Sequence, residues 1–171
     1  QQIQDAGGID FALLGIGSNG HIAANEPFSG VNSRTRLCVL DPITRLRLAS
    51  DFFGEKNVPA QALTMGMGTL LESRQVVLMA LGEHKACIVR DLAEGNITNR
   101  IPASALQEHV NAMVCLDPAS ASEMQEVVMP WTSDSVQWDE TMITRTMVWL
   151  CEQTGKALSK LEDDDFRNHN L

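Results

Sequence analysis

The chain has 171 residues, 44% of them hydrophobic and 20% charged, which is typical of a globular domain that can bury a core without disulfides or metals. Its 22 acidic and 13 basic residues give a net charge of −9, which disfavours binding to nucleic acid or to an anionic membrane surface. No run approaches the roughly 20 apolar residues of a membrane span, and no signal peptide opens the chain. We therefore expect a cytoplasmic protein whose four cysteines, none in a C-x-x-C pair, are buried free thiols.

The first predicted element is a strand at residues 9–14, an apolar run that ends at Gly15 and suits burial on both faces, as in a parallel sheet. A glycine-rich turn follows it. Further strands are predicted at 36–40, 76–81 and 113–116, and helices at 44–53, 84–93 and 102–109. Because strands alternate with helices, the pattern predicts an α/β fold with a mostly parallel sheet and with sites at the C-terminal strand ends.

The character of the sequence changes after Pro118. Residues 119–123 are small and polar, 130–138 contain two tryptophans, and 141–150 have helical periodicity. The acidic run 162–165 is interpreted as a solvated end rather than a metal site. We predict one domain at residues 1–130 and a connector or extra helical tail at 131–171. Because neither end of the sequence looks like a domain boundary, we expect a fragment of a larger protein, truncated on its N-terminal side.

The residues that suggest chemistry lie between Gly15 and Pro27, directly after the first predicted strand. His21 would stand at the C-terminal end of that strand, and histidine is the side chain best suited to exchange a proton near neutral pH. Glu26 follows in a tight turn and could fold back to bond one imidazole nitrogen, leaving the other for substrate. Alternatively, this is a surface loop in which His21 only caps a helix.

The same segment contains the pattern G-x-G-x-x-G at Gly15, Gly17 and Gly20, which also occurs in dinucleotide-binding folds. That interpretation requires a helix directly after Gly20, but the sequence Asn25-Glu26-Pro27 interrupts any such helix. A bound dinucleotide is therefore the weaker hypothesis.

The sequence LGIGSNGHIAANEP of residues 14–27 resembles the active-site loop of the glucosamine-6-phosphate deaminases, also called isomerases. The resemblance extends in order through SRTR at 33–36, ALTMGMGTLL at 62–71, GEHKA at 82–86 and PASALQ at 102–107. It covers roughly residues 9–124, which suggests the C-terminal part of that family's domain.

The resemblance implies a Rossmann-like three-layer fold and an aldose–ketose isomerase and deaminase, classed with hydrolases, that works without cofactor or metal. Such an enzyme opens the ring of an amino-sugar phosphate, moves a proton from C2 to C1 and releases ammonia, leaving a ketose phosphate. His21 matches the ring-opening histidine, Glu26 its acidic partner and Lys85 the lysine that holds the phosphate. Asn19 would position a hydroxyl, Gly17 and Gly20 would line the substrate, and the family suggests a homo-oligomer.

Three positions depart from the family pattern. Asn19 stands where an aspartate is usual, and an amide can hydrogen-bond but cannot take a proton. Asp51 stands where an arginine often binds phosphate, so that role is lost or passes to Arg45 or Arg47. Cys38 replaces a lysine of the allosterically regulated members, which makes that regulation doubtful here.

Two other functions remain open from the sequence. A 6-phosphogluconolactonase would share the G-x-G-x-x-G-H loop, and a non-catalytic sugar-phosphate sensor would explain Asn19 and Asp51 as traces of a decayed site. The family's phosphate loop and the aspartate that moves the C2 proton have no match in these 171 residues. We therefore expect this chain alone to be inactive.

Overall fold

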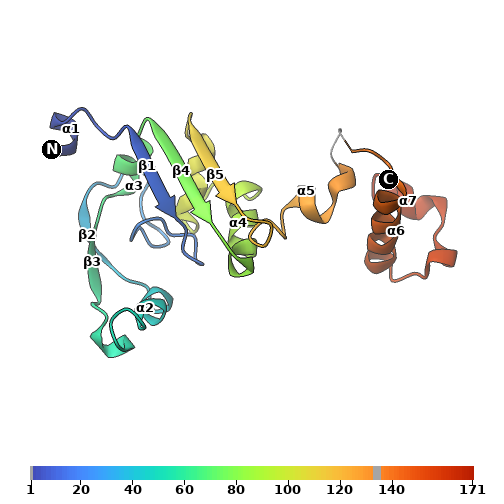
Figure 1. Cartoon of the computed structure of the whole chain (residues 1–171), viewed down its shortest axis with the longest axis horizontal. Coiled ribbons are helices and arrows are strands. Elements are labelled where there is room, and N and C mark those ends of the chain that lie inside the picture. Colours follow the sequence, from blue (N-terminus) through green and yellow to red (C-terminus); the bar gives the residue numbers. More distant parts are fainter. Residues whose placement is uncertain (1, 133–135) are drawn as a thin grey trace. The chain divides into compact units, whose positions relative to one another are not determined.

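The computed structural model describes residues 2–132 and 136–171, and the chain divides into two compact units, one ending at Met124 and the other spanning Gln125–Leu171 (Figure 1). The first unit is α/β and contains all the predicted site residues. The role predicted for residues 131–171, a connector or extra tail, stays a prediction.

A three-stranded parallel sheet forms the centre of the first unit, in the order β1 (Phe11–Gly15), β4 (Gln75–Ala80) and β5 (Ala112–Leu116). In the register of this sheet Leu14 lies beside Leu78, and Leu78 lies beside Val114. The α/β class with a mostly parallel sheet, predicted from the alternation of strands and helices, is confirmed.

Helices cover one face of this sheet: α3 (Met67–Leu71), α4 (Ala86–Ala93) and the 3₁₀ helix η3 (Pro102–Glu108). Val76 and Leu78 point into that core and are fully buried, with Leu92 packed among them. On the other face Phe11 and Leu13 are 54% and 59% exposed, so the predicted burial of the first strand on both faces is wrong. Successive strand side chains point to opposite faces, and the helices named here pack against only one set.

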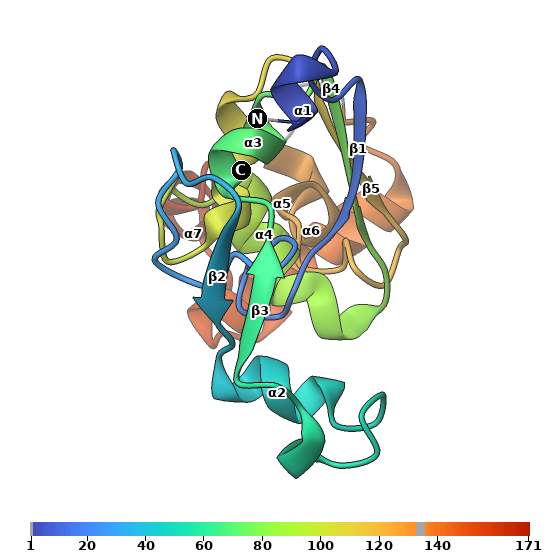
Figure 2. The ribbon, with the colours of Figure 1, turned by 90° about the vertical axis from the view of Figure 1, so that its left-hand side faces the viewer.

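A two-stranded antiparallel ribbon pairs β2 (Arg36–Val39) with β3 (Gln61–Thr64). Its strands are joined through α2 (Pro42–Leu48) and the 3₁₀ helix η1 (Glu55–Asn57), and Figure 2 shows the ribbon leading to α2. The helix predicted for 44–53 therefore ends at Leu48, and the chain turns at residues 49–54. The predicted strand at 36–40 belongs to this ribbon rather than to the parallel sheet.

The remaining elements of the first unit are short. Helix α1 (Gln2–Asp5) precedes the sheet, and the 3₁₀ helix η2 (Glu83–Lys85) leads from β4 into α4. Asp117 accepts hydrogen bonds from the backbone N–H of Gly82 at 3.0 and 3.1 Å. These bonds, and others from Ser120, keep the pKa of Asp117 below its usual range and fix the turn that leads to Lys85.

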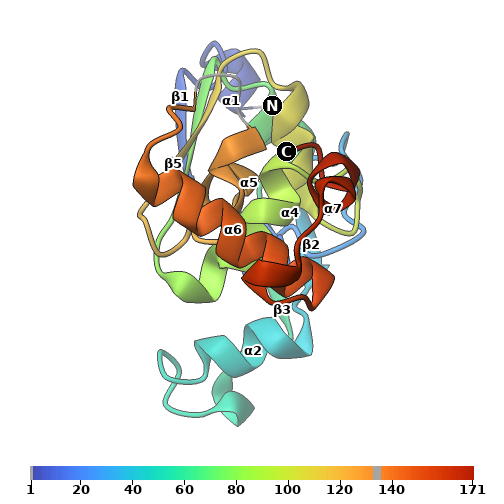
Figure 3. The same ribbon diagram turned by 90° about the vertical axis from the view of Figure 1, so that its right-hand side faces the viewer.

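The second unit contains α5 (Gln125–Val128), η4 (Pro130–Thr132), α6 (Glu140–Thr154), η5 (Leu158–Lys160) and α7 (Asp163–Asn168), the last lying beside α6 in Figure 3. The Trp149 ring lies 5.2 Å from that of Trp131 and 5.6 Å from that of His169, measured between centroids. Lys156 pairs with Asp165 at 2.8 Å, so part of the acidic run predicted as solvated ties α7 to the segment that follows α6.

The four cysteines are free thiols, but the prediction that they are buried is wrong. Cys87 is exposed on α4 and donates to Glu123, and the other three are partly exposed.

Across residues 2–132 and 136–171, no helix combines the length and apolarity that a membrane span needs. Over the same residues, no group of three or more His, Cys, Asp or Glu side chains is arranged to hold a metal ion.

Candidate active site

The loop after β1 reverses sharply and brings His21 to the C-terminal end of that strand. The backbone N–H of Gly17 donates to the carbonyl of His21 at 2.9 Å, and that of Gly20 donates to Gly17 at 3.0 Å. Gly20 has φ of +82°, a left-handed conformation that favours glycine. Residues 21–35 form turns and isolated bridges rather than a helix, so the dinucleotide-binding pattern lacks the helix it needs.

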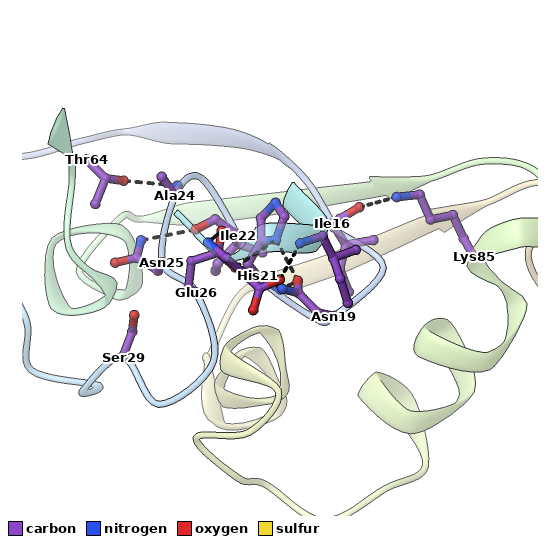
Figure 4. Close-up of polar contacts among 12 residues, drawn as sticks. Ile16, Asn19, His21, Ile22, Ala24, Asn25, Glu26, Ser29, Thr64 and Lys85 are labelled. Atoms are coloured by element: carbon purple, nitrogen blue, oxygen red, sulfur yellow. Dashed lines mark hydrogen bonds and ion pairs between the residues drawn. The ribbon is translucent and has the colours of Figure 1, made fainter. Parts of the chain in front are cut away.

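Three polar side chains meet in this loop, as Figure 4 shows. The Nδ1 atom of His21 lies 2.6 Å from Oδ1 of Asn19, and Nδ2 of Asn19 donates to Oε2 of Glu26 at 2.8 Å. Nδ1 of His21 is also 3.5 Å from Oε2 of Glu26. The structure thus brings the predicted catalytic residues together. It places Asn19, rather than Glu26, in the shortest contact with the imidazole.

Glycine is needed beneath the imidazole ring. A Cβ atom at Gly17 would lie 2.5 Å from Nε2 of His21 and closer still to Nδ1 and Cε1. A Cβ atom at Gly20 would meet Ile101. Both glycines that the sequence assigns to substrate binding therefore also have a packing role, because each allows a neighbouring side chain to approach the backbone.

The loop is held to the ribbon by residues that the sequence interpretation did not single out. Asn25 is fully buried, and its Nδ2 atom donates to the carbonyls of Ile22 at 3.1 Å and Met65 at 2.8 Å. Arg36 donates to Oδ1 of Asn25 at 2.7 Å, and the N–H of Ala24 donates to the hydroxyl of a threonine at the end of β3. These contacts act as a clamp between the loop and the ribbon. The available signal in the sequence was the asparagine of Asn25-Glu26-Pro27.

Lys85 reaches the same loop from the start of α4. Its Nζ atom donates to the backbone carbonyl of Ile16 at 2.6 Å, a contact visible in Figure 4. Partial burial lowers the pKa of Lys85, and the positive charge of Arg47 lowers it further. The structure therefore places the predicted phosphate-binding lysine beside the loop that carries His21.

The two arginines considered for phosphate binding lie on different sides of α2. Arg45 points toward the backbone carbonyl of Val58, 3.5 Å from its Nη2 atom. The charge of Arg47, by contrast, acts on both Lys85 and His21. Within the described part of the chain, no ion pair joins Arg47 to a carboxylate. The positive charge of Arg47 thus acts on two side chains of the loop site, whereas the recorded side-chain contact of Arg45 is with the backbone of Val58.

The electrostatic setting of His21 favours its neutral form. Burial of the ring is the largest cause of its lowered pKa. The charges of Lys85 and Arg47 lower the pKa further, and those of Glu26 and Asp41 oppose the shift. Asp41 is the N-cap of α2, and its backbone N–H donates to Oε1 of Glu26 at 3.3 Å. A neutral imidazole here can accept a proton from a substrate hydroxyl.

Residues 1–115 match the family model of the glucosamine-6-phosphate isomerases and 6-phosphogluconolactonases. The chain belongs to this family. It is 48% identical to the glucosamine-6-phosphate deaminase of Shewanella woodyi over 126 residues, which is 74% of this chain and 48% of that protein. The solved structure of a monomeric glucosamine-6-phosphate deaminase is 44% identical to it, with a TM-score of 0.70 over 72% of this chain and 51% of that one. The Rossmann-like fold implied by the resemblance is therefore confirmed.

The chain spans about half the length of such deaminases. A longer family member, a glucosamine-6-phosphate deaminase-like protein of Bacteroides thetaiotaomicron, is 42% identical over all 171 residues, which are 26% of its length. That match includes the second unit, residues 125–171, which lies outside the residues 1–115 matched by the family model. The second unit thus has a counterpart in a relative of which this whole chain makes up only 26%.

Proposed function

We propose that the full-length protein converts an amino-sugar phosphate, glucosamine 6-phosphate in the first instance, to a ketose phosphate and ammonia. The observation that carries this proposal is the arrangement of His21. Its Nδ1 atom is held by Asn19, and no hydrogen bond to Nε2 is found within the described residues. The identity of 42–48% to proteins named as deaminases or deaminase-like supports the same reaction.

His21 would act in ring opening. In this step the C1 hydroxyl gives its proton to Nε2 of His21, the C1–O5 bond breaks, and the proton passes from Nε2 to O5, so the imidazole ends as it began. The later transfer of a proton from C2 to C1 needs a base that the resemblance assigns outside these 171 residues. Overall one water molecule is consumed for each ammonia released.

Phosphate binding would use Lys85 and Arg47. No carboxylate pairs with Arg47 within the described residues, so its positive charge and that of Lys85 repel each other. A phosphate group between them would remove that repulsion. Arg47 would thereby take the role that Asp51, an exposed carboxylate, cannot fill. Gly17 and Gly20 would line the sugar as backbone, and we assign Arg45 a structural role on α2 instead of substrate binding.

A lactonase is the second candidate, because the family model covers both activities. It too would need a proton carrier at the position of His21. A sensor without turnover is the third candidate. The same purified protein separates the three: ammonia release indicates the deaminase, faster lactone hydrolysis the lactonase, and tight sugar-phosphate binding without turnover the sensor.

The decisive experiment is ammonia release from glucosamine 6-phosphate by the full-length protein and its His21→Ala variant. We expect the variant to lose about 10²-fold or more, the usual contribution of a general acid–base group. His109→Gln is the matched control, because His109 bonds the backbone of Ser73 away from the site and its loss should leave the rate unchanged. An unaltered rate in His21→Ala would remove this residue from the mechanism.

Two further assignments stay predictions. The family resemblance suggests a homo-oligomer, while the solved relative with a TM-score of 0.70 is described as monomeric. Light scattering of the full-length protein at several concentrations would give its mass directly. The cytoplasmic location is equally untested and would be checked by fractionation.

A further inference from the structure

Asn19 connects His21 to Glu26 through both ends of its amide. Its Oδ1 atom faces Nδ1 of His21 at 2.6 Å, and its Nδ2 atom faces Oε2 of Glu26 at 2.8 Å. The other carboxylate oxygen, Oε1, accepts from the backbone N–H of Asp41 at 3.3 Å. Both oxygens of Glu26 are therefore acceptors, as in the ionised form.

This arrangement fixes which atoms donate and which accept in the contacts among His21, Asn19 and Glu26. If the Asn19 amide were turned over, its oxygen would face a carboxylate oxygen of Glu26, and two acceptors would repel. The amide oxygen must therefore face His21, and Nδ1 of the imidazole must carry the hydrogen. The neutral ring then presents an unprotonated Nε2, the atom that can take a proton from substrate.

The amide also adds no charge beside the ring. An aspartate at this position would place a second carboxylate against Glu26 and a negative charge at hydrogen-bond distance from Nδ1. Such a charge would stabilise the imidazolium and raise the pKa of His21, against the effects of burial, Lys85 and Arg47. Glu26 and Asp41 are the two acids that already act on the ring.

We propose that Asn19 is a positioning residue that locks His21 in its Nδ1–H tautomer and keeps the imidazole neutral and ready to accept the ring-opening proton. The role differs from the one suggested by sequence, in which Asn19 holds a substrate hydroxyl, because both ends of its amide are already engaged. This inference rests on the proposed deaminase function for its catalytic meaning. Its structural content, tautomer and charge, is independent of any substrate.

The test is nuclear magnetic resonance of the full-length protein labelled with ¹⁵N-histidine, with the His21 signals assigned by their loss in His21→Ala. In the unaltered protein we expect the Nδ1–H tautomer and a pKa below 6.5, the ordinary histidine value. In Asn19→Asp we expect a pKa raised by about one unit or more, as for an opposite charge within 4–6 Å. The acidic limb of kcat/KM should move upward with it.

Asn111→Asp is the matched control, because it adds the same charge at the opposite end of the sheet, before β5, and should leave the His21 titration in place. An Nε2–H tautomer in the unaltered protein would overturn the inference, and so would equal His21 titrations in Asn19→Asp and Asn111→Asp. The first of these results does not depend on Asn19→Asp, so misfolding of that variant would not remove the test. Absence of ammonia release would reject the proposed function. The inference about Asn19 would still be decided by the tautomer measured for His21.

Discussion

Replacing Gly17 with alanine is the sharpest test of how the loop positions the imidazole. The new Cβ would lie within 2.5 Å of three ring atoms of His21, whereas ordinary contact begins at 3.4 Å. The backbone at this position cannot yield easily, because the Gly17 N–H donates to the His21 carbonyl. We therefore expect the ring, rather than the loop, to move.

The size of the effect follows from that displacement. The ring must retreat by roughly 1 Å, and a misplacement of this size in a catalytic group costs about 10²-fold in rate. The same movement breaks the 2.6 Å contact with Asn19, whose net value is about 1 kcal/mol. Stability should therefore fall only slightly while kcat/KM falls by about two orders of magnitude.

The assay is ammonia release by full-length Gly17→Ala, with thermal unfolding measured on the same sample. Gly15→Ala is the control, since a Cβ at Gly15 has no neighbour within 4 Å and the residue ends β1 in an ordinary conformation. Gly15→Ala should retain normal activity. Unreduced kcat/KM in Gly17→Ala would refute the placement of the His21 ring over this glycine.

Two other substitutions test the loop clamp and the cationic part of the site. Asn25→Ala removes a fully buried amide that holds Met65, and we expect a loss of about 2–4 kcal/mol in the free energy of unfolding, measured by urea titration. Arg47→Ala should raise KM for the sugar phosphate by about tenfold and raise the pKa of Lys85, because a nearby positive charge is removed. Arg45→Ala is its control on the same helix, and equal KM values in the two variants would contradict the assignment of Arg47.

The parallel sheet could be predicted because its strands are short apolar runs that end at a turn residue. Gly15 ends β1, and Asp117-Pro118 follows β5. The ribbon was only half predicted, since β3 (Gln61–Thr64) is four residues long and carries a polar residue at each end. Its formation depends on pairing with β2, a contact made across more than twenty residues that local periodicity cannot reveal.

Burial on both faces of β1 could not be decided from the sequence. Phe11 and Leu13 are as apolar as Ala12 and Leu14, so the run itself does not tell which set meets a helix. The end of the helix predicted at 44–53 could not be decided from the sequence either. Its apolar spacing through Leu46 and Phe53 is that of a packed face, yet Phe53 is 96% exposed and lies beyond the helix.

The site was predictable in composition but not in connectivity. His21 and Glu26 could be singled out because a proton carrier and a carboxylate follow an apolar strand. The position of the Asn19 amide between them could not be predicted, because the direction of that side chain depends on where the oxygens of Glu26 lie. The proposed choice of Arg47 over Arg45 likewise rests on the fold, because the charge of Arg47 acts on Lys85 and His21.

The charge of the site also illustrates why net composition constrains partners but not pockets. The chain carries a net charge of −9, yet Lys85 and Arg47 both act on His21 with positive charge. An acidic surface repels polyanions over long distances, whereas two nearby cations attract a small phosphate locally. The charge of Arg47 lowers the pKa of Lys85, and a phosphate group bound between the two cations would offset that repulsion. Under the proposed function, the phosphate of the substrate would supply the counter-charge for these two cations beside His21.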